Sequence, residues 1–204
     1  MDPTDFDAVL LDMDGTLVDS DAAVERSWTS WSAEYGVDAG ALLEDAHGSP
    51  AATTVRRVRP DLDEAGVAAA ADRQLRLQYD DLSDVAATAG ATDLLATLER
   101  LGLPWAVVTS ADARLAAARL EAAGITVPML VTVEDISAGK PDPEGFLLAA
   151  ERLGVDPARC LVVEDAPPGV RAGRAAGATV AALKGLDADV SITDLGQLAR
   201  MLAD

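Results

Sequence analysis

The chain has 204 residues, half of them apolar, and a formal net charge of −19 at pH 7. This composition is typical of a globular protein with one sizeable core and excludes a disordered chain. The negative charge opposes binding to nucleic acid or to an anionic membrane. No apolar stretch is long enough to span a membrane and the acidic N-terminus does not resemble a signal peptide, so a cytoplasmic monomer is expected.

The first predicted element is a buried strand over Ala8–Leu11, and two aspartates, Asp12 and Asp14, follow it directly. Because side chains alternate along a strand, both carboxylates should leave its end on the same side. Open α/β sheets bind ligands at the carboxyl ends of their strands. Gly15 allows a sharp turn there and a close approach to an anion. Taken alone, the segment is equally compatible with an acidic turn.

The next part of the chain, residues 19–88, contains no convincing strand. Helices are predicted over three segments that the run Gly48-Ser49-Pro50 interrupts. These segments are Ala22–Tyr35, Ala39–Ala46 and Glu64–Leu82. The pattern predicts an α-helical segment inserted after the first strand.

The remainder alternates short apolar runs with amphipathic stretches. Strands are predicted over Trp105–Val108, Met129–Val133, Leu161–Val163 and Thr179–Ala182. Helices are predicted over Asp112–Ala123 and from Pro143 through Ala150, where Asp112 is the expected N-cap. The alternation predicts a doubly wound, Rossmann-like parallel α/β sheet formed by residues 1–18 and 89–204.

Polar groups follow two later strands of this sheet. Thr109 and Ser110 end one strand and the pair Glu164-Asp165 ends another, while Lys140 lies between them in a Gly-Lys-Pro segment. The chain has only two lysines, which suggests that a compact ammonium group is required at this position. Two carboxylate clusters suit Mg²⁺, and a hydroxyl and an ammonium suit phosphate oxygens. The set indicates a phosphoryl-transfer site in which one carboxylate acts as nucleophile.

These segments, in their order and spacing, resemble the four motifs of the haloacid dehalogenase superfamily. The matching residues are Asp12–Thr16, Thr109 or Ser110, Lys140, and Glu164-Asp165. The stretches DMDGTLVDS, PWAVVTS, GKPDPEGFLLAA and VVEDAPPGVRAG are similar to helical-cap members, the bacterial broad-specificity sugar-phosphate phosphatases. Glycerol-phosphate and 2-deoxyglucose-phosphate phosphatases and β-phosphoglucomutase are also similar.

The resemblance implies a Mg²⁺-dependent phosphatase that hydrolyses small sugar or polyol phosphate monoesters through an aspartyl-phosphate. It implies that Asp12 is the nucleophile, that Asp14 is the general acid and base, and that Lys140 offsets negative charge. The implied phosphate-binding residues are Thr16 and either Thr109 or Ser110. The implied metal ligands are Asp12, Asp14 through its backbone carbonyl, Asp165 and Glu164. Strand alternation favours Asp165 over Glu164.

The resemblance also implies that residues 19–88 are a helical cap. It places His47 and Gly48 in a specificity loop of this cap, where Ser49 departs from the basic or bulky residue of similar proteins. Several reactions occur on this scaffold, so alternatives stay open. A β-phosphoglucomutase-like phosphomutase and a non-catalytic phosphometabolite-binding module are two of them. Dehalogenation is disfavoured because Asp14 supplies an acid, and Schiff-base phosphonate hydrolysis because residues 19–88 contain no lysine.

Overall fold

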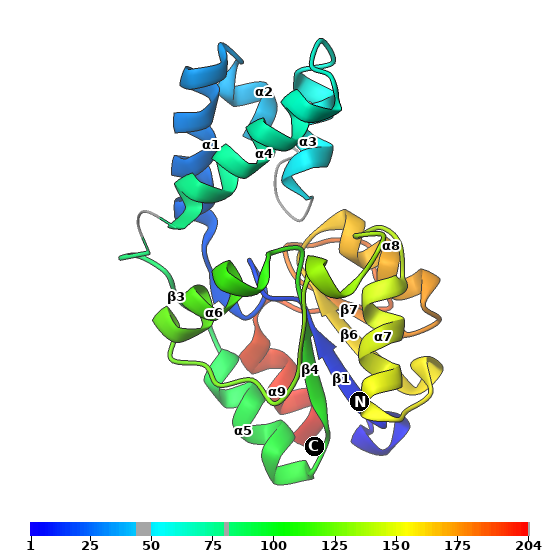
Figure 1. The fold of residues 1–204 in the computed structure, drawn as a ribbon. Coiled ribbons are helices and arrows are strands. Elements are labelled where there is room, and N and C mark those ends of the chain that lie inside the picture. Colours follow the sequence, from blue (N-terminus) through cyan, green and yellow to red (C-terminus); the bar gives the residue numbers. More distant parts are fainter. Residues whose placement is uncertain (44–49, 80–81, 204) are drawn as a thin grey trace.

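A computed structural model describes residues 1–43, 50–79 and 82–203. Its main sheet has six parallel strands in the order β5-β4-β1-β6-β7-β8 (Figure 1). Their bounds are β1 Ala8–Leu11, β4 Trp105–Val108, β5 Leu130–Val131, β6 Cys160–Glu164, β7 Thr179–Ala182 and β8 Val190–Ser191. β1 lies between β4 and β6, so the carboxyl ends of these three strands are neighbours. The predicted doubly wound α/β fold with a helical insertion after the first strand is confirmed.

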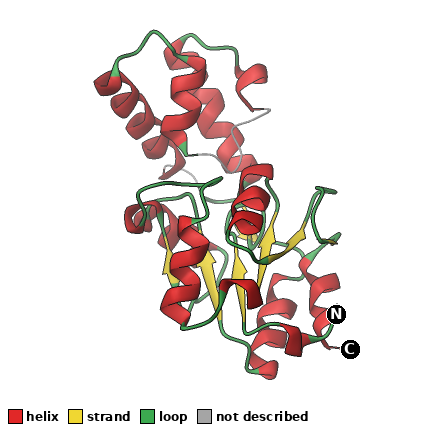
Figure 2. Cartoon of the chain, turned by 90° about the vertical axis from the view of Figure 1, so that its right-hand side faces the viewer, coloured by secondary structure: helices red, strands yellow, loops and turns green. Residues whose placement is uncertain are grey.

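Helices cover both faces of this sheet (Figure 2). One face packs against α5 (Ala91–Leu101), α6 (Ala113–Ala122) and α9 (Leu195–Ala203). The other packs against α7 (Glu144–Leu153) and α8 (Pro167–Ala175).

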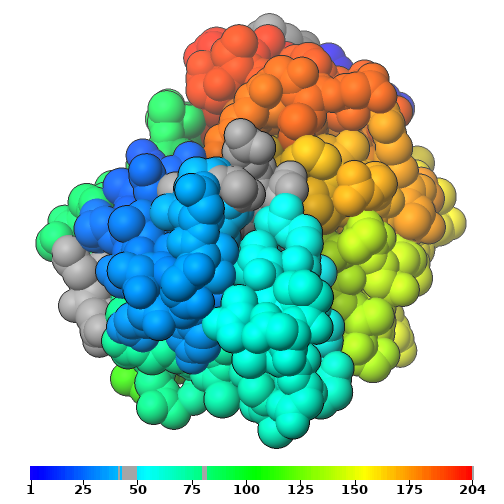
Figure 3. Space-filling view, turned by 90° about the horizontal axis from the view of Figure 1, so that it is seen from above, coloured from blue at the N-terminus to red at the C-terminus, as the bar shows by residue number. Residues whose placement is uncertain are grey.

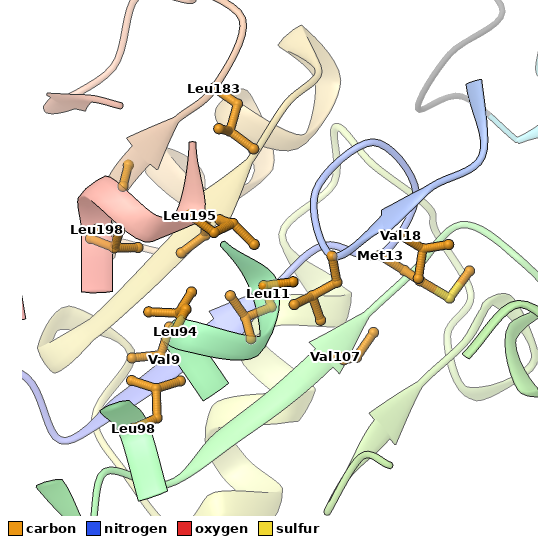
Figure 4. Packing of buried hydrophobic residues seen from close by; sticks show 14 of the residues in the cluster. Val9, Leu11, Met13, Val18, Leu94, Leu98, Val107, Leu183, Leu195 and Leu198 are labelled. Atoms are coloured by element: carbon orange, nitrogen blue, oxygen red, sulfur yellow. The ribbon is translucent and has the colours of Figure 1, made fainter. Parts of the chain in front are cut away.

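The buried strand residues alternate between these two layers, as the pleat requires. Val9 and Leu11 of β1 point toward α5 and α9, where Figure 4 shows them beside leucines of both helices. Leu10 belongs to the opposite cluster. We refer to the sheet and these five helices as the core.

Four helices form a separate layer, the cap. They are α1 (Asp21–Tyr35), α2 (Ala39–Leu43), α3 (Ala51–Val58) and α4 (Glu64–Tyr79). Trp28, Trp31, Val55 and Val67 are among the residues of a hydrophobic cluster confined to the cap. The indole of Trp31 donates a 2.8 Å hydrogen bond to the Ala70 carbonyl, which satisfies its buried N–H. From above, α1 and α3 lie over the middle of the molecule (Figure 3).

The two chain segments that join cap and core pair with each other. β2 (Val18–Asp19) and β3 (Ala86–Ala87) form an antiparallel ladder that the sequence did not predict. Two-residue strands are too short for a period-2 pattern, so only their tertiary proximity reveals them. Thr88 strengthens the junction, since its Oγ1 donates 2.5 Å to the Thr16 carbonyl.

Other differences from the predicted elements are local. β5 is shorter than predicted because Thr132 begins a capped 3₁₀ turn over Val133–Asp135. The edge strand β8 was not predicted, nor was α3, whose β-branched residues have low helix propensity. Two helices were predicted to end at Ala46 and Leu82. The described helices end at Leu43 and Tyr79, and in each case the next residues lie outside the described ranges. Among the described residues, no helix combines the length and the apolar character that a membrane crossing requires.

Gly90 gives a direct test of how the cap returns to the core. Its φ is +80°, and a Cβ there would lie 2.0 Å from the backbone nitrogen of Gly196. Gly102 has a similar φ of +66° but open space around it. We expect Gly102→Ala to cost about 1 kcal/mol of unfolding free energy through its left-handed backbone. Gly90→Ala should cost about 1–3 kcal/mol more, because backbone atoms collide. Urea unfolding of both variants measures the difference, and equal losses would contradict the packing argument.

Candidate active site

Asp12 and Lys140 form a buried ion pair at the carboxyl end of β1. The Lys140 ammonium contacts Asp12 Oδ1, lies 2.7 Å from Glu164 Oε1 and donates a 3.0 Å hydrogen bond to the Val108 carbonyl. Lys140 and Asp12 are 8% and 7% exposed, so water screens their attraction only weakly. The lysine is thus held between the ends of β4, β1 and β6.

Burial changes the protonation of these groups. Burial, followed by the neighbouring Glu164 carboxylate, holds the pKa of Asp12 well above its ordinary value. Burial also raises the pKa of Glu164. Burial alone would lower the pKa of Lys140, but the Asp12 and Glu164 carboxylates outweigh it and raise that pKa. The ammonium is therefore charged at neutral pH. Its single positive charge faces two carboxylates, those of Asp12 and Glu164.

The two acids after β6 turn in different directions. Glu164 lies against Gly169 of α8, where an added Cβ would fall 1.8 Å from its Oε1. Asp165 pairs instead with Lys184, with Oδ2 2.8 Å from Nζ. Thr16 is fully buried, and its Oγ1 donates to Asp165 Oδ1 at 3.4 Å. Each acid of the pair therefore has its own lysine.

Three buried carboxylates nevertheless meet at one point. Asp12, Glu164 and Asp165 each offer an oxygen, and these oxygens lie within 4.8 Å of one another. Two lysines face the three carboxylates, which leaves one negative charge in excess. An all-oxygen set with excess negative charge fits a hard divalent cation. The residues present could therefore hold a metal ion.

Gly15 brings the motif after β1 back onto this cluster. Its φ is +80°, and a Cβ there would lie 2.1 Å from Asp165 Oδ2. Its N–H donates to the Val18 carbonyl at 2.8 Å, which closes the turn. The sharp turn expected at this glycine is present, and it also allows a close approach to Asp165.

Asp14 has different partners from Asp12. Its Oδ1 accepts a 2.7 Å hydrogen bond from Ser20 Oγ, at the entrance to the cap. The same oxygen lies 2.7 Å from Arg119 Nη1. A quarter of the Asp14 side chain is exposed, more than for the other acids of the site.

A pocket lies between the cap and the core at these residues. Asp12, Asp14, Thr109 and Ser110 line its core side. The cap side includes apolar and amide side chains, contributed by Val24, Trp28, Ala51, Gln74 and Gln78. A ligand in the pocket would thus contact both paired aspartates and both candidate hydroxyls.

Both candidate hydroxyls lie at the pocket. Thr109 is buried, and its Oγ1 accepts a 3.0 Å hydrogen bond from the Ala111 N–H, which leaves its own O–H to donate elsewhere. Ser110 also lines the pocket. His47 and Gly48, the other expected specificity residues, lie outside the described residues.

Sequence reasoning missed three contributors to the site. Lys184 was left unassigned because no motif surrounds it, although it is the chain's second lysine. Arg119 lies on the buried face of α6. An arginine at a buried helix position is unusual, so the sequence pattern could have indicated a paired side chain there. Gln78 on α4 accepts a 2.6 Å hydrogen bond from it. These contacts join segments far apart in sequence, and spacing does not reveal them.

A capped α/β sheet with two aspartates, a lysine and an acid pair at adjacent strand ends defines a hydrolase of the phosphoryl-transfer type. The chain belongs to the haloacid dehalogenase-like hydrolases, whose family model matches residues 6–177.

Named relatives and solved structures agree with this assignment. The chain is 42% identical to hexitol phosphatase A of Escherichia coli over 175 residues, covering 85% of this chain and 81% of the relative. It is 33% identical to 2-deoxyglucose-6-phosphate phosphatase 1 of Saccharomyces cerevisiae, covering 95% and 89%. A hydrolase structure from Pseudomonas syringae matches with a TM-score of 0.86 and 26% identity over 95% of this chain and 96% of that one.

The raised pKa of Asp12 predicts that the effect of Asp12→Asn on the unfolding free energy depends on pH. A carboxyl with a higher pKa in the folded state binds more protons there than in the unfolded chain, where its pKa is about 4. Its cost to folding is small below about pH 4 and grows as pH rises through the raised pKa. In chelator-treated protein, the unfolding free energy of Asp12→Asn relative to the unchanged protein should therefore increase with pH.

Asp7→Asn is the matched control at the other end of the same strand. Its hydrogen bond with Arg159 lowers the pKa of Asp7, so this carboxylate stabilises the fold above its unfolded-state pKa. The relative stability of Asp7→Asn should decrease as pH rises to about 5 and stay constant above that, so its trend has the opposite sign and lies at acidic pH. Urea titrations between about pH 3 and pH 9 on the three proteins measure both trends. A flat profile for Asp12→Asn would contradict the electrostatic account.

Proposed function

We propose that the protein is a Mg²⁺-dependent phosphatase that hydrolyses small sugar or polyol phosphate monoesters through an aspartyl-phosphate. One observation carries the proposal. Asp12, paired with the buried ammonium of Lys140, and Asp14 line the same pocket between cap and core. This arrangement supports Asp12 as the group that attacks phosphorus and Asp14 as the group that transfers a proton to the leaving oxygen.

The named relatives support the substrate class. One is a hexitol phosphatase and another a 2-deoxyglucose-6-phosphate phosphatase, and both match most of the chain. The wall of the pocket agrees, since it combines the Trp28 ring with two buried amides, Gln74 and Gln78. Indole faces and amides suit a polyhydroxylated carbon chain, which needs apolar contact together with hydrogen-bond partners.

In the first step, Asp12 attacks phosphorus in line with the leaving oxygen. The new bond joins a carboxylate oxygen of Asp12 to phosphorus, and the bond from phosphorus to the sugar oxygen breaks. Asp14 donates its proton to that oxygen, so the alcohol leaves neutral. Lys140 and the hydroxyl of Thr109 or Ser110 offset charge on the phosphoryl oxygens. Thr16 contributes by holding Asp165.

In the second step, Asp14 accepts a proton from a water molecule that attacks the phosphoryl group. The bond between phosphorus and the Asp12 oxygen breaks, which releases inorganic phosphate and restores the carboxylate. Asp14 is then protonated again for the next cycle. The same side chain thus serves as the acid in the first step and as the base in the second.

Asp12, Asp165 and Glu164 would hold Mg²⁺, with the backbone carbonyl of Asp14 as a further ligand. When bound, the ion neutralises negative charge on the carboxylates and on the transferring phosphoryl group. The three side chains fit this ion because all are buried oxygen donors close to one another. Between the two acids after β6, Asp165 is the favoured direct ligand, because alternation along the strand turns Glu164 the other way.

Residues 19–88 act as a lid in this proposal. The cap closes over the phosphate, excludes bulk water and contributes to substrate choice through the loop with His47 and Gly48. A phosphomutase would require a cap cation to bind a second phosphate. The cap arginines Arg56, Arg57 and Arg59 do not line the described pocket, and Arg56 and Arg59 pair with Glu64 and Asp61. The geometry therefore favours hydrolysis.

The two aspartates predict distinct kinetic losses. Asp12→Asn removes the nucleophile and should lower kcat by at least about 10³-fold. Asp14→Asn removes the acid and base and should lower kcat by about 10²–10⁴-fold with little change in KM. Asp7→Asn, remote from the site on the same strand, should leave both constants unchanged. Near-normal turnover by Asp12→Asn would contradict its role as nucleophile.

Phosphate release over a substrate panel tests the metal and the substrate class together. Chelator-treated protein should release no phosphate, and added Mg²⁺ should restore turnover of several hexitol, hexose and polyol phosphates. Phosphoglycolate and a pentose phosphate complete the panel. Full activity without metal would exclude the Mg²⁺ role. Sugar-phosphate interconversion that depends on a bisphosphate primer would favour a mutase instead.

A further inference from the structure

Arg119 is a buried arginine for which the two-step reaction gives no role. It lies on α6, on the same helix face as Leu115 and Leu120, and it is 2% exposed. An unpaired guanidinium in such a place would be strongly unfavourable, so its partners are essential to the fold.

Those partners belong to opposite sides of the pocket. Arg119 Nη1 lies 2.7 Å from Asp14 Oδ1 in the core, and Nη2 donates to Gln78 Oε1 in the cap at 2.6 Å. Its Nε has no hydrogen-bond partner among the described residues. The orientation of the guanidinium therefore depends on these two contacts, one to the proposed acid and one to the cap.

The contact with the cap continues into its interior. Gln78 Nε2 donates to Gln74 Oε1 at 2.6 Å, and Gln74 Nε2 donates to Ser27 Oγ at 3.2 Å. All three side chains are buried, so this chain of hydrogen bonds joins α4 and α1 to Arg119. Buried hydrogen-bond networks of this kind fix side-chain geometry closely.

Asp14 is also held from the cap entrance. Ser20 and Arg119 both meet Oδ1 of Asp14, at 2.7 Å each. Two donors on one oxygen restrict rotation of the carboxyl group. The other oxygen, Oδ2, is then the one that exchanges a proton with the substrate. The acid is thereby fixed by groups whose own positions depend on the cap.

We propose that Arg119 is the positioning residue for Asp14 and that it transmits the position of the cap to this acid through Gln78. The inference rests on the proposed phosphatase reaction, in which Asp14 protonates the leaving oxygen. An open cap would withdraw Gln78, release the guanidinium and leave Asp14 poorly aimed. Proton transfer would then be efficient only when the cap is in place over a substrate.

The leaving group provides the test. kcat/KM reports the steps up to aspartyl-phosphate formation, where an alkoxide needs a proton and p-nitrophenolate does not. For Arg119→Met, kcat/KM should fall by about 10²-fold with a hexitol phosphate and with propyl phosphate. With p-nitrophenyl phosphate it should stay within about 3-fold of the unchanged enzyme, because no acid is required.

Two further variants separate the cap contact from a general effect. Gln78→Leu keeps Arg119 beside Asp14 but removes its cap partner, and should show the same leaving-group dependence at about a 10-fold loss. Arg114→Met is the matched control, since Arg114 lies on the same helix, over the Tyr79 ring and exposed. It should match the unchanged enzyme on all three substrates. If Arg119→Met does not fold, Gln78→Leu decides the question.

Three results would overturn the proposal. Equal losses on all three substrates would show a merely structural role. A raised KM for the hexitol phosphate with unchanged kcat would make Arg119 a substrate-binding residue. Unchanged kinetics would remove any role in the reaction. Failure of the proposed function is distinguishable, because the unchanged enzyme itself would then release phosphate from none of the substrates.

Discussion

The site depends on one electrostatic constraint, the neutralisation of three carboxylates that the sheet buries together. β1 lies between β4 and β6, so the acids that follow β1 and β6 must converge at the same edge. Burial and mutual repulsion push the pKa of Asp12 upward, and the ammonium of Lys140 opposes this shift. A buried charge without its partner costs about 3–5 kcal/mol, so the lysine and the acids must be retained as a set.

The same constraint explains why the backbone near the site is so closely specified. Gly15 turns the chain with a positive φ and at the same time leaves room for the Asp165 carboxylate. Gly169 leaves room for the Glu164 carboxylate in the same way on the opposite layer. Any other residue would displace an acid from the cluster, so these two glycines serve the placement of charge as much as the path of the chain.

The sequence revealed most of the fold and the chemistry of the central residues. All five predicted strands are present, one of them shorter than predicted, and the two predicted core helices are confirmed as α6 and α7, because their buried positions follow regular periods. The elements that were missed are short or locally unfavourable, as in the two-residue strands β2, β3 and β8 and the β-branched α3. Lys184, Arg119 and Gln78 could not be assigned, because their roles come from tertiary contacts, Lys184 with Asp165 and Arg119 with Asp14 and Gln78.

Lysine and arginine have different partners in this structure. The chain has two lysines, and both lie against the acidic cluster, Lys140 at Asp12 and Lys184 at Asp165. Arginines pair instead with acids on the surface, as in the two-donor contacts of Arg73 with Glu34. Such exposed pairs contribute about 0–1 kcal/mol each and tolerate rearrangement.

A compact ammonium fits between carboxylates where a planar fork would not, and it leaves their remaining oxygens open to a metal ion or a phosphoryl group. Arg119 is the informative exception. It lies outside the acidic cluster, and its broad guanidinium reaches two partners at once, Asp14 in the core and Gln78 in the cap. Lysine is therefore used where charge must be neutralised at a point, and buried arginine where two separate parts of the molecule must be held in register.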